Sequence, residues 1–234
     1  MAKKKLKAKS DPAAPAKVAP EAPDLGERFI EWIQKHRRQV IVGVGSVVVI
    51  GAIVLFVFAY QRNREAAAAE ALDRARFASQ SGNFALAASD LSRLISGFKG
   101  TRAAGEGAIL LGQVRLLQEQ PSLAAEELRR AVDGGLEDQF RASAYSLLAA
   151  ALENLGNMEE AGDAYLDAAN STWYGLLSAQ YLNDAGRAFW AAGDTARAIA
   201  AYDRVVTEHG EAPSAAEARV RLGELRARQA APSS

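Results

Sequence analysis

Few side chains in this sequence could carry out chemistry, and none of them stands in a pattern typical of a catalytic or metal site. There is no cysteine, which excludes thiolate nucleophiles, disulfides and Cys-based metal sites. The two histidines, His36 and His209, lack a His, Cys or paired-acid partner at ligand spacing. Adjacent acids such as Glu159 and Glu160 fit solvent-facing helix positions better than a catalytic pair. We therefore expect no enzyme activity, no metal and no cofactor.

An uncharged, apolar run from Val40 to Tyr60 is the clearest single element. At about 1.5 Å per residue, a helix of this length reaches about 30 Å, the thickness of the hydrocarbon core of a bilayer. The run is longer and starts later than a cleaved secretory signal would, although cleavage after Ala59 stays open. We predict a transmembrane helix over residues 40–60, preceded by an amphipathic juxtamembrane helix over residues 24–39.

The charges on the two sides of this run differ. Residues 1–39 hold ten Lys or Arg against five Asp or Glu, and residues 61–234 hold 18 against 23. The positive-inside rule then predicts a cytoplasmic N-terminus, although Arg62 and Arg64 argue weakly for the opposite orientation. Residues 1–23 are rich in Lys, Pro and Ala, so we expect a disordered tail that serves as a topology signal rather than binding nucleic acid.

After the run, the composition becomes rich in Ala, Leu, Glu and Arg, which favours helices, and four features recur every 37 residues. They are a small residue, a turn residue, an alanine, and a Leu or Tyr four residues after the alanine. The four columns are Ala75, Gly112, Ala149 and Gly186; Gly82, Glu119, Gly156 and Gly193; Ala87, Ala124, Ala161 and Ala198; and Leu91, Leu128, Tyr165 and Tyr202.

These columns predict a helical hairpin repeated four times. Small residues let two helices approach closely, a glycine ends the first helix in a left-handed conformation, and the Leu or Tyr fills the space between helices. We predict a repeat domain over residues 65–229, with a last helix over Ala215–Gln229 covering the end of the stack and a disordered tail at 230–234.

The columns resemble the tetratricopeptide repeat, most closely in the third unit, with Ala149, Gly156, Ala161, Tyr165 and Ala168. This resemblance implies an all-α fold, a right-handed α-solenoid of about four helical hairpins plus a C-terminal capping helix. Glu119 departs from the turn glycine, and the period is three residues longer than is usual for the family. We therefore expect irregular loops between the units.

The resemblance also implies a concave groove, lined by the first helix of each hairpin, that binds a protein partner. We expect Trp190 and Arg187 to dominate binding, because interface energy concentrates in Trp and Arg, with packing of Trp190 against the last helix as the alternative. We expect Trp173 and Tyr174 to pack their loop. The predicted groove residues are Glu106, Ile109, Gln113, Leu116, Ser146, Ala150, Glu153, Asn154, Gln180, Asn183, Arg187 and Trp190.

The layout of tail, single span and repeat domain resembles the YfgM-like family, the ancillary subunit of the bacterial Sec translocon. It implies a single-pass protein of the inner membrane, with a periplasmic repeat domain that links translocon subunits to periplasmic chaperones. One alternative is a repeat scaffold for outer-membrane or cell-wall assembly, because Ala212–Ala218 also resembles repeats of such proteins. A second is a regulatory or enzymatic membrane protein with an unrecognised site.

Overall fold

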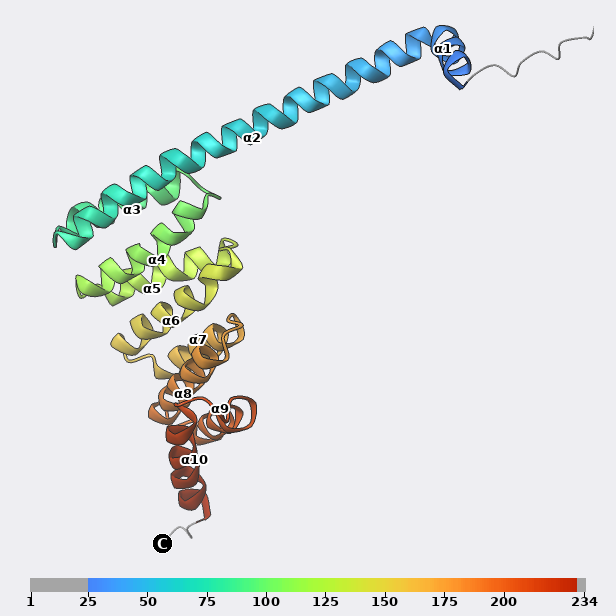
Figure 1. Cartoon of the computed structure of the whole chain (residues 1–234). Helices are drawn as coiled ribbons and strands as arrows, with labels where there is room; N and C mark the ends of the chain where they lie inside the picture. Colours follow the sequence, from blue (N-terminus) through green and yellow to red (C-terminus); the bar gives the residue numbers. More distant parts are fainter. Residues whose placement is uncertain (1–24, 231–234) are drawn as a thin grey trace, which may run out of the picture. The chain divides into compact units, whose positions relative to one another are not determined.

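The computed structural model describes residues 25–230, which are entirely α-helical apart from turns and loops (Figure 1). The expected tail at 1–23, the start of the juxtamembrane helix at Asp24 and the last residues, 231–234, lie outside the described part. The helices are α1 (Leu25–Lys35), α2 (Arg37–Gln80), α3 (Phe84–Gly97), α4 (Arg102–Leu117), α5 (Pro121–Asp133), α6 (Asp138–Asn154), α7 (Met158–Asn170), α8 (Gly175–Ala191), α9 (Thr195–Glu208) and α10 (Ala215–Ala230).

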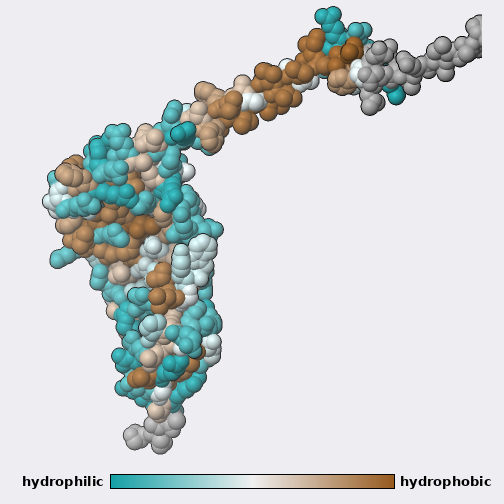
Figure 2. Space-filling view, in the orientation of Figure 1, coloured by the Kyte–Doolittle hydropathy of each residue, from teal (hydrophilic) through white to brown (hydrophobic). Residues whose placement is uncertain are grey.

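The apolar run lies within one long helix, α2. Contacts divide the chain into two compact units after Val57, and α2 contributes to both. Among the described helices, α2 alone is long and apolar enough to cross a membrane, and its apolar side chains are exposed as a hydrophobic surface (Figure 2). A turn at His36 separates α2 from α1, so the juxtamembrane helix ends earlier than the predicted residue 39.

From Phe58 onward the helices pack as the four predicted hairpins. The last part of α2 packs with α3, and the pairs α4 and α5, α6 and α7, and α8 and α9 follow in order along the chain (Figure 1). The last helix, α10, packs on α9 and α8. The fold is therefore all-α, with sequential helix pairs stacked as a solenoid, and no linker separates the apolar run of α2 from the first hairpin.

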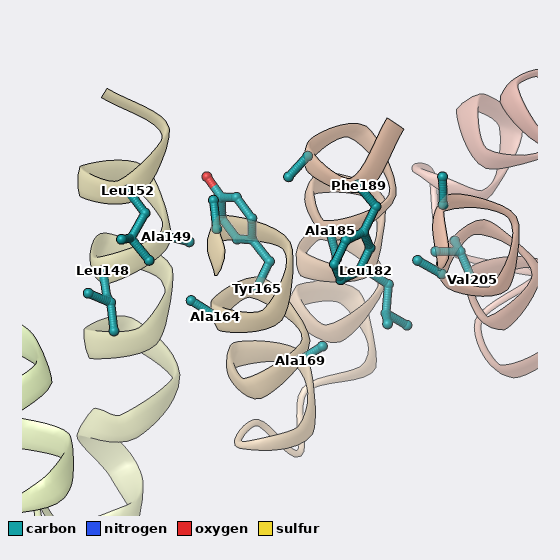
Figure 3. Packing of buried hydrophobic residues seen from close by; sticks show 14 of the residues in the cluster. Leu148, Ala149, Leu152, Ala164, Tyr165, Ala169, Leu182, Ala185, Phe189 and Val205 are labelled. Carbon is teal, nitrogen blue, oxygen red and sulfur yellow. The ribbon is translucent and has the colours of Figure 1, made fainter. Parts of the chain in front are cut away.

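The repeated residues form the core between these helices. The four alanines of the repeat, Ala87, Ala124, Ala161 and Ala198, are all fully buried. A Cβ added at Gly112 would come within 2.7 Å of Leu128, and one at Gly186 would come within 2.7 Å of the Tyr202 ring. The small residue therefore makes room for the large residue of the next helix, as the sequence pattern predicts. Figure 3 shows the same alternation of small and large side chains across α6, α7, α8 and α9.

The turn residue of each repeat adopts a left-handed conformation at the end of the first helix of its hairpin. Gly82, Gly156 and Gly193 have φ between +77° and +84°, a region open to glycine at little cost. Glu119 occupies the same position in the second hairpin with a φ of +56°. Arg115 holds this turn, because its guanidinium donates to the side-chain oxygen of Gln120 at 2.8 Å.

Candidate partner-binding surface

The predicted groove residues lie on α4, α6 and α8, the first helices of the last three hairpins. The three charged ones form ion pairs between successive first helices. Glu106 on α4 pairs with Arg76 on α2, and Arg187 Nη1 on α8 lies 2.8 Å from Glu153 Oε1 on α6. These side chains therefore hold neighbouring repeats together, which leaves less of their charge for a partner.

A polar network surrounds the pair between Glu153 and Arg187. The Tyr165 hydroxyl donates to Glu153 Oε2 at 3.3 Å, and burial together with the charge of Glu153 raises the pKa of that hydroxyl. Burial opposes the charge of Arg187, but its hydrogen bond and attraction to Glu153 outweigh this effect and raise the pKa of the guanidinium. Burial also raises the pKa of Asp184, and the positive charge of Arg187 offsets this increase only in part. The two acids, Glu153 and Asp184, hold the Arg187 guanidinium between α6 and its own helix.

The uncharged groove residues divide into packed and accessible ones. Ile109 and Leu116 are half-buried against the main core. Asn183 is 8% exposed, and its side-chain amide donates to the Ser214 carbonyl at 2.9 Å, so it fastens the loop before α10. The exposed members of the set are Gln113, Asn154 and Gln180.

Trp190 lies against the last helix. Its ring is half-buried on the main core, and the guanidinium carbons of Arg221 and Arg228, both on α10, lie 5.7 and 5.5 Å from its centroid. Each distance lies within the range of a cation–π interaction. This placement favours packing against α10, the alternative that the sequence left open, and the binding role of Trp190 stays a prediction.

The loop between α7 and α8 carries two exposed aromatic side chains, and the expectation that they pack this loop was wrong. Trp173 is 86% exposed and Tyr174 is 60% exposed, so neither packs the loop as expected. Their rings meet edge to face with centroids 5.4 Å apart. Leu176 beside them is also exposed. Two consecutive aromatics in a loop between repeats were the signal for this patch, which we call the aromatic patch.

The second helices carry ion pairs that join successive repeats. Glu159 and Glu160 on α7 reach Arg197 on α9 at 2.5 Å and Arg129 on α5 at 3.0 Å. A shallow pocket of about 390 Å³ between α5, α6 and α7 includes the second of these pairs in its lining. Within residues 25–230, no group of three or more His, Asp or Glu side chains could hold a metal ion.

Comparison with known proteins places this fold in a family. The model of the tetratricopeptide repeat-like domain matches residues 31–227. No curated protein matches the chain.

Three solved structures under 25% identical share the fold. A putative kinesin light chain with TPR-like repeats from Podosopora anserina has 18% identity and a TM-score of 0.52, with 67% of this chain and 83% of that one covered. A tetratricopeptide repeat protein from Parabacteroides merdae has 14% identity and a TM-score of 0.55, covering 69% and 60%. PilF of Pseudomonas aeruginosa has 20% identity and a TM-score of 0.51, covering 71% of each chain. With the family model matching most of its length, the chain belongs to the tetratricopeptide repeat-like domain family.

Proposed function

We propose that this protein is a membrane-anchored scaffold that works beside the Sec translocon and links it to periplasmic chaperones. The main observation behind this proposal is that α2 contains the apolar run and continues to Gln80 as the first helix of the repeat array. An anchor joined to the array without a linker suits work beside another membrane complex better than free reach across a compartment. The excess of Lys and Arg in residues 1–39 supports a cytoplasmic N-terminus and a periplasmic array.

The aromatic patch is the surface that we assign to the protein partner, together with the exposed groove residues. Exposed Trp and Tyr side chains bury much apolar area at low entropic cost, and they are enriched among residues that dominate interface energy. The groove is less suited to a charged partner, because Glu106, Glu153 and Arg187 already have partners of opposite charge. An apolar or aromatic segment of an emerging chain or a chaperone fits the patch.

Two experiments on the full chain test this function. A reporter that is active only outside the cytoplasm, fused after Ser234, should be active, and a reporter active only inside should be silent. Crosslinking in cells followed by purification should recover translocon subunits and periplasmic chaperones with the chain. Repeated recovery of neither class would contradict the translocon role. Recovery of outer-membrane or cell-wall assembly proteins instead would favour the alternative scaffold.

A further inference from the structure

Three cationic side chains surround a pocket that begins where the apolar run ends. The pocket measures about 490 Å³ and is lined by Phe58, Gln61, Arg62, Arg64, Glu65, Lys99, Gly100 and Thr101. The two arginines lie on α2, while the lysine comes from the loop between α3 and α4. Within residues 25–230, none of the three cations forms an ion pair, so their charge is available to an anion.

The loop is held in place by hydrogen bonds that leave two of the cations unengaged. Arg64 donates to the Lys99 carbonyl at 3.3 Å, which joins the loop to α2. Thr101 donates to the Phe98 carbonyl at 2.8 Å and accepts from the Ala104 amide at 3.2 Å. The side chains of Arg62 and Lys99 are exposed and are not part of this bonding.

Glu65, the one acid in the lining, is engaged elsewhere. Its two carboxylate oxygens accept the backbone amides of Arg102 and Ala103, at 3.1 and 3.0 Å, at the N-terminus of α4. A carboxylate at this end of a helix is stabilised by the helix dipole and by the amides that it caps. Its charge is thus used to cap α4, and the pocket keeps a net positive charge.

We propose that this pocket binds the phosphate of an anionic phospholipid headgroup. The proposal rests on α2 crossing a membrane, as in the proposed function. Arg62 lies about 3 Å along the helix from Tyr60, the end of the apolar run, because an α-helix rises about 1.5 Å per residue. At that depth the neighbouring phosphates are those of lipid headgroups, and Phe58 offers an apolar wall for the glycerol and upper acyl chain.

The test uses the full chain reconstituted in nanodiscs of phosphatidylcholine with phosphatidylglycerol. After stripping with mild detergent, mass spectrometry measures the ratio of the two lipids that remain bound. We expect enrichment of phosphatidylglycerol on the native chain. The double variant Arg62→Gln with Lys99→Gln should lower the enrichment by roughly fivefold for each cation removed. Arg74→Gln, on the same helix with an exposed guanidinium, is the matched control and should keep the enrichment.

The outcomes separate this site from the anchor. Equal enrichment on the native chain and the double variant, or none on either, would overturn the lipid site while leaving the anchor intact. A chain that stays out of the nanodiscs would overturn the anchor and the lipid site together. Loss of phosphatidylglycerol when inorganic phosphate is added to the wash would show that the two anions compete for the pocket, which supports the site. Binding of inorganic phosphate to the detergent-solubilised chain, with no enrichment of phosphatidylglycerol in nanodiscs, would show a site for a free anion and contradict a lipid site.

Discussion

At the scale of single residues, Gly186 and Gly223 occupy the same repeat position in different surroundings. A Cβ at Gly186 would meet the Tyr202 ring at 2.7 Å, whereas one at Gly223 would meet nothing within 4 Å. We expect Gly186→Ala to destabilise the fold by about 1–3 kcal/mol, because the helices must move apart. Gly223→Ala should stabilise it by up to about 1 kcal/mol, because alanine favours the helix.

Thermal unfolding of the detergent-solubilised full chain measures both changes. Equal shifts of the melting temperature for the two variants would contradict the helix contact that we describe.

Glu119 is strained where the other three hairpins have glycine. Its φ of +56° costs a residue with a side chain about 1–2 kcal/mol more than it costs glycine. Glu119→Gly should therefore raise the free energy of unfolding by about 1 kcal/mol. Gly156→Ala, which places a side chain at a φ of +80°, should lower it by a similar amount. Denaturant unfolding tests the pair, and a stabilising Gly156→Ala would refute the left-handed turn.

Asp184 makes the stability of the array depend on pH. Burial raises the pKa of Asp184 in the folded state, so its contribution to stability is present below its unfolded pKa, about 3.9, and is lost as the pH rises through the folded value. Asp184→Asn should therefore gain stability relative to the native chain between pH 4 and neutral pH.

Asp194 provides a control of opposite sign. Hydrogen bonds from the backbone and side chain of Arg197 lower the pKa of Asp194, so its contribution is present at neutral pH and is lost as the pH falls. Asp194→Asn should lose stability relative to the native chain over the same interval. Melting curves of both variants across this pH range measure these changes. A shift of the melting temperature in the same direction for both variants, relative to the native chain, would contradict these assignments.

At the scale of helices, the packing of α10 depends on Trp190. Replacing this side chain with alanine removes its contacts with the main core and with Arg221 and Arg228. We expect Trp190→Ala to lower the free energy of unfolding by about 1–3 kcal/mol, because the side chain is only half-buried, with the loss concentrated in α10. Hydrogen exchange should show faster exchange of the α10 amides than of those in α6. Unchanged exchange in α10 with weakened partner binding would instead favour the groove role of Trp190.

The helices and their pairing followed from the repeat columns. Each column has a local physical cause: Ala161 is buried because of its size, and Gly193 stands where φ is positive. Such causes are visible in the residue type itself, so the hairpins and loops could be predicted. The break at His36 could not, because the residues on both sides of it favour helix.

The roles of the tryptophans could not be predicted for another reason. Whether Trp173 packs or projects depends on how the loop between α7 and α8 leaves its helices, and no residue type encodes this. The partners of Glu106 and Glu153 likewise lie about one repeat away in the sequence, on neighbouring first helices. The convergence of Lys99 with Arg64 also becomes visible only when the hairpin is closed.

At the scale of the whole molecule, the chain joins an apolar helix to an array that presents an aromatic patch. Ion pairs that hold the array together occupy all three charged groove positions, Glu106, Glu153 and Arg187. The exposed side chains of the patch contribute little to the packing of the array. The proposed function therefore predicts that partners bind at the patch and at the accessible groove residues. The second helices, whose surfaces carry ion pairs between repeats, should bind less.

Site-specific photo-crosslinking in cells can identify the surface of the array that partners contact. A photoreactive amino acid is placed at Trp173 in the aromatic patch, or at Leu123, an exposed apolar position on the second helix α5. We expect adducts with translocon subunits or periplasmic chaperones from position 173 and few or none from position 123. Adducts of equal yield from both positions, or none from position 173 in a chain that is correctly folded in the membrane, would contradict this expectation.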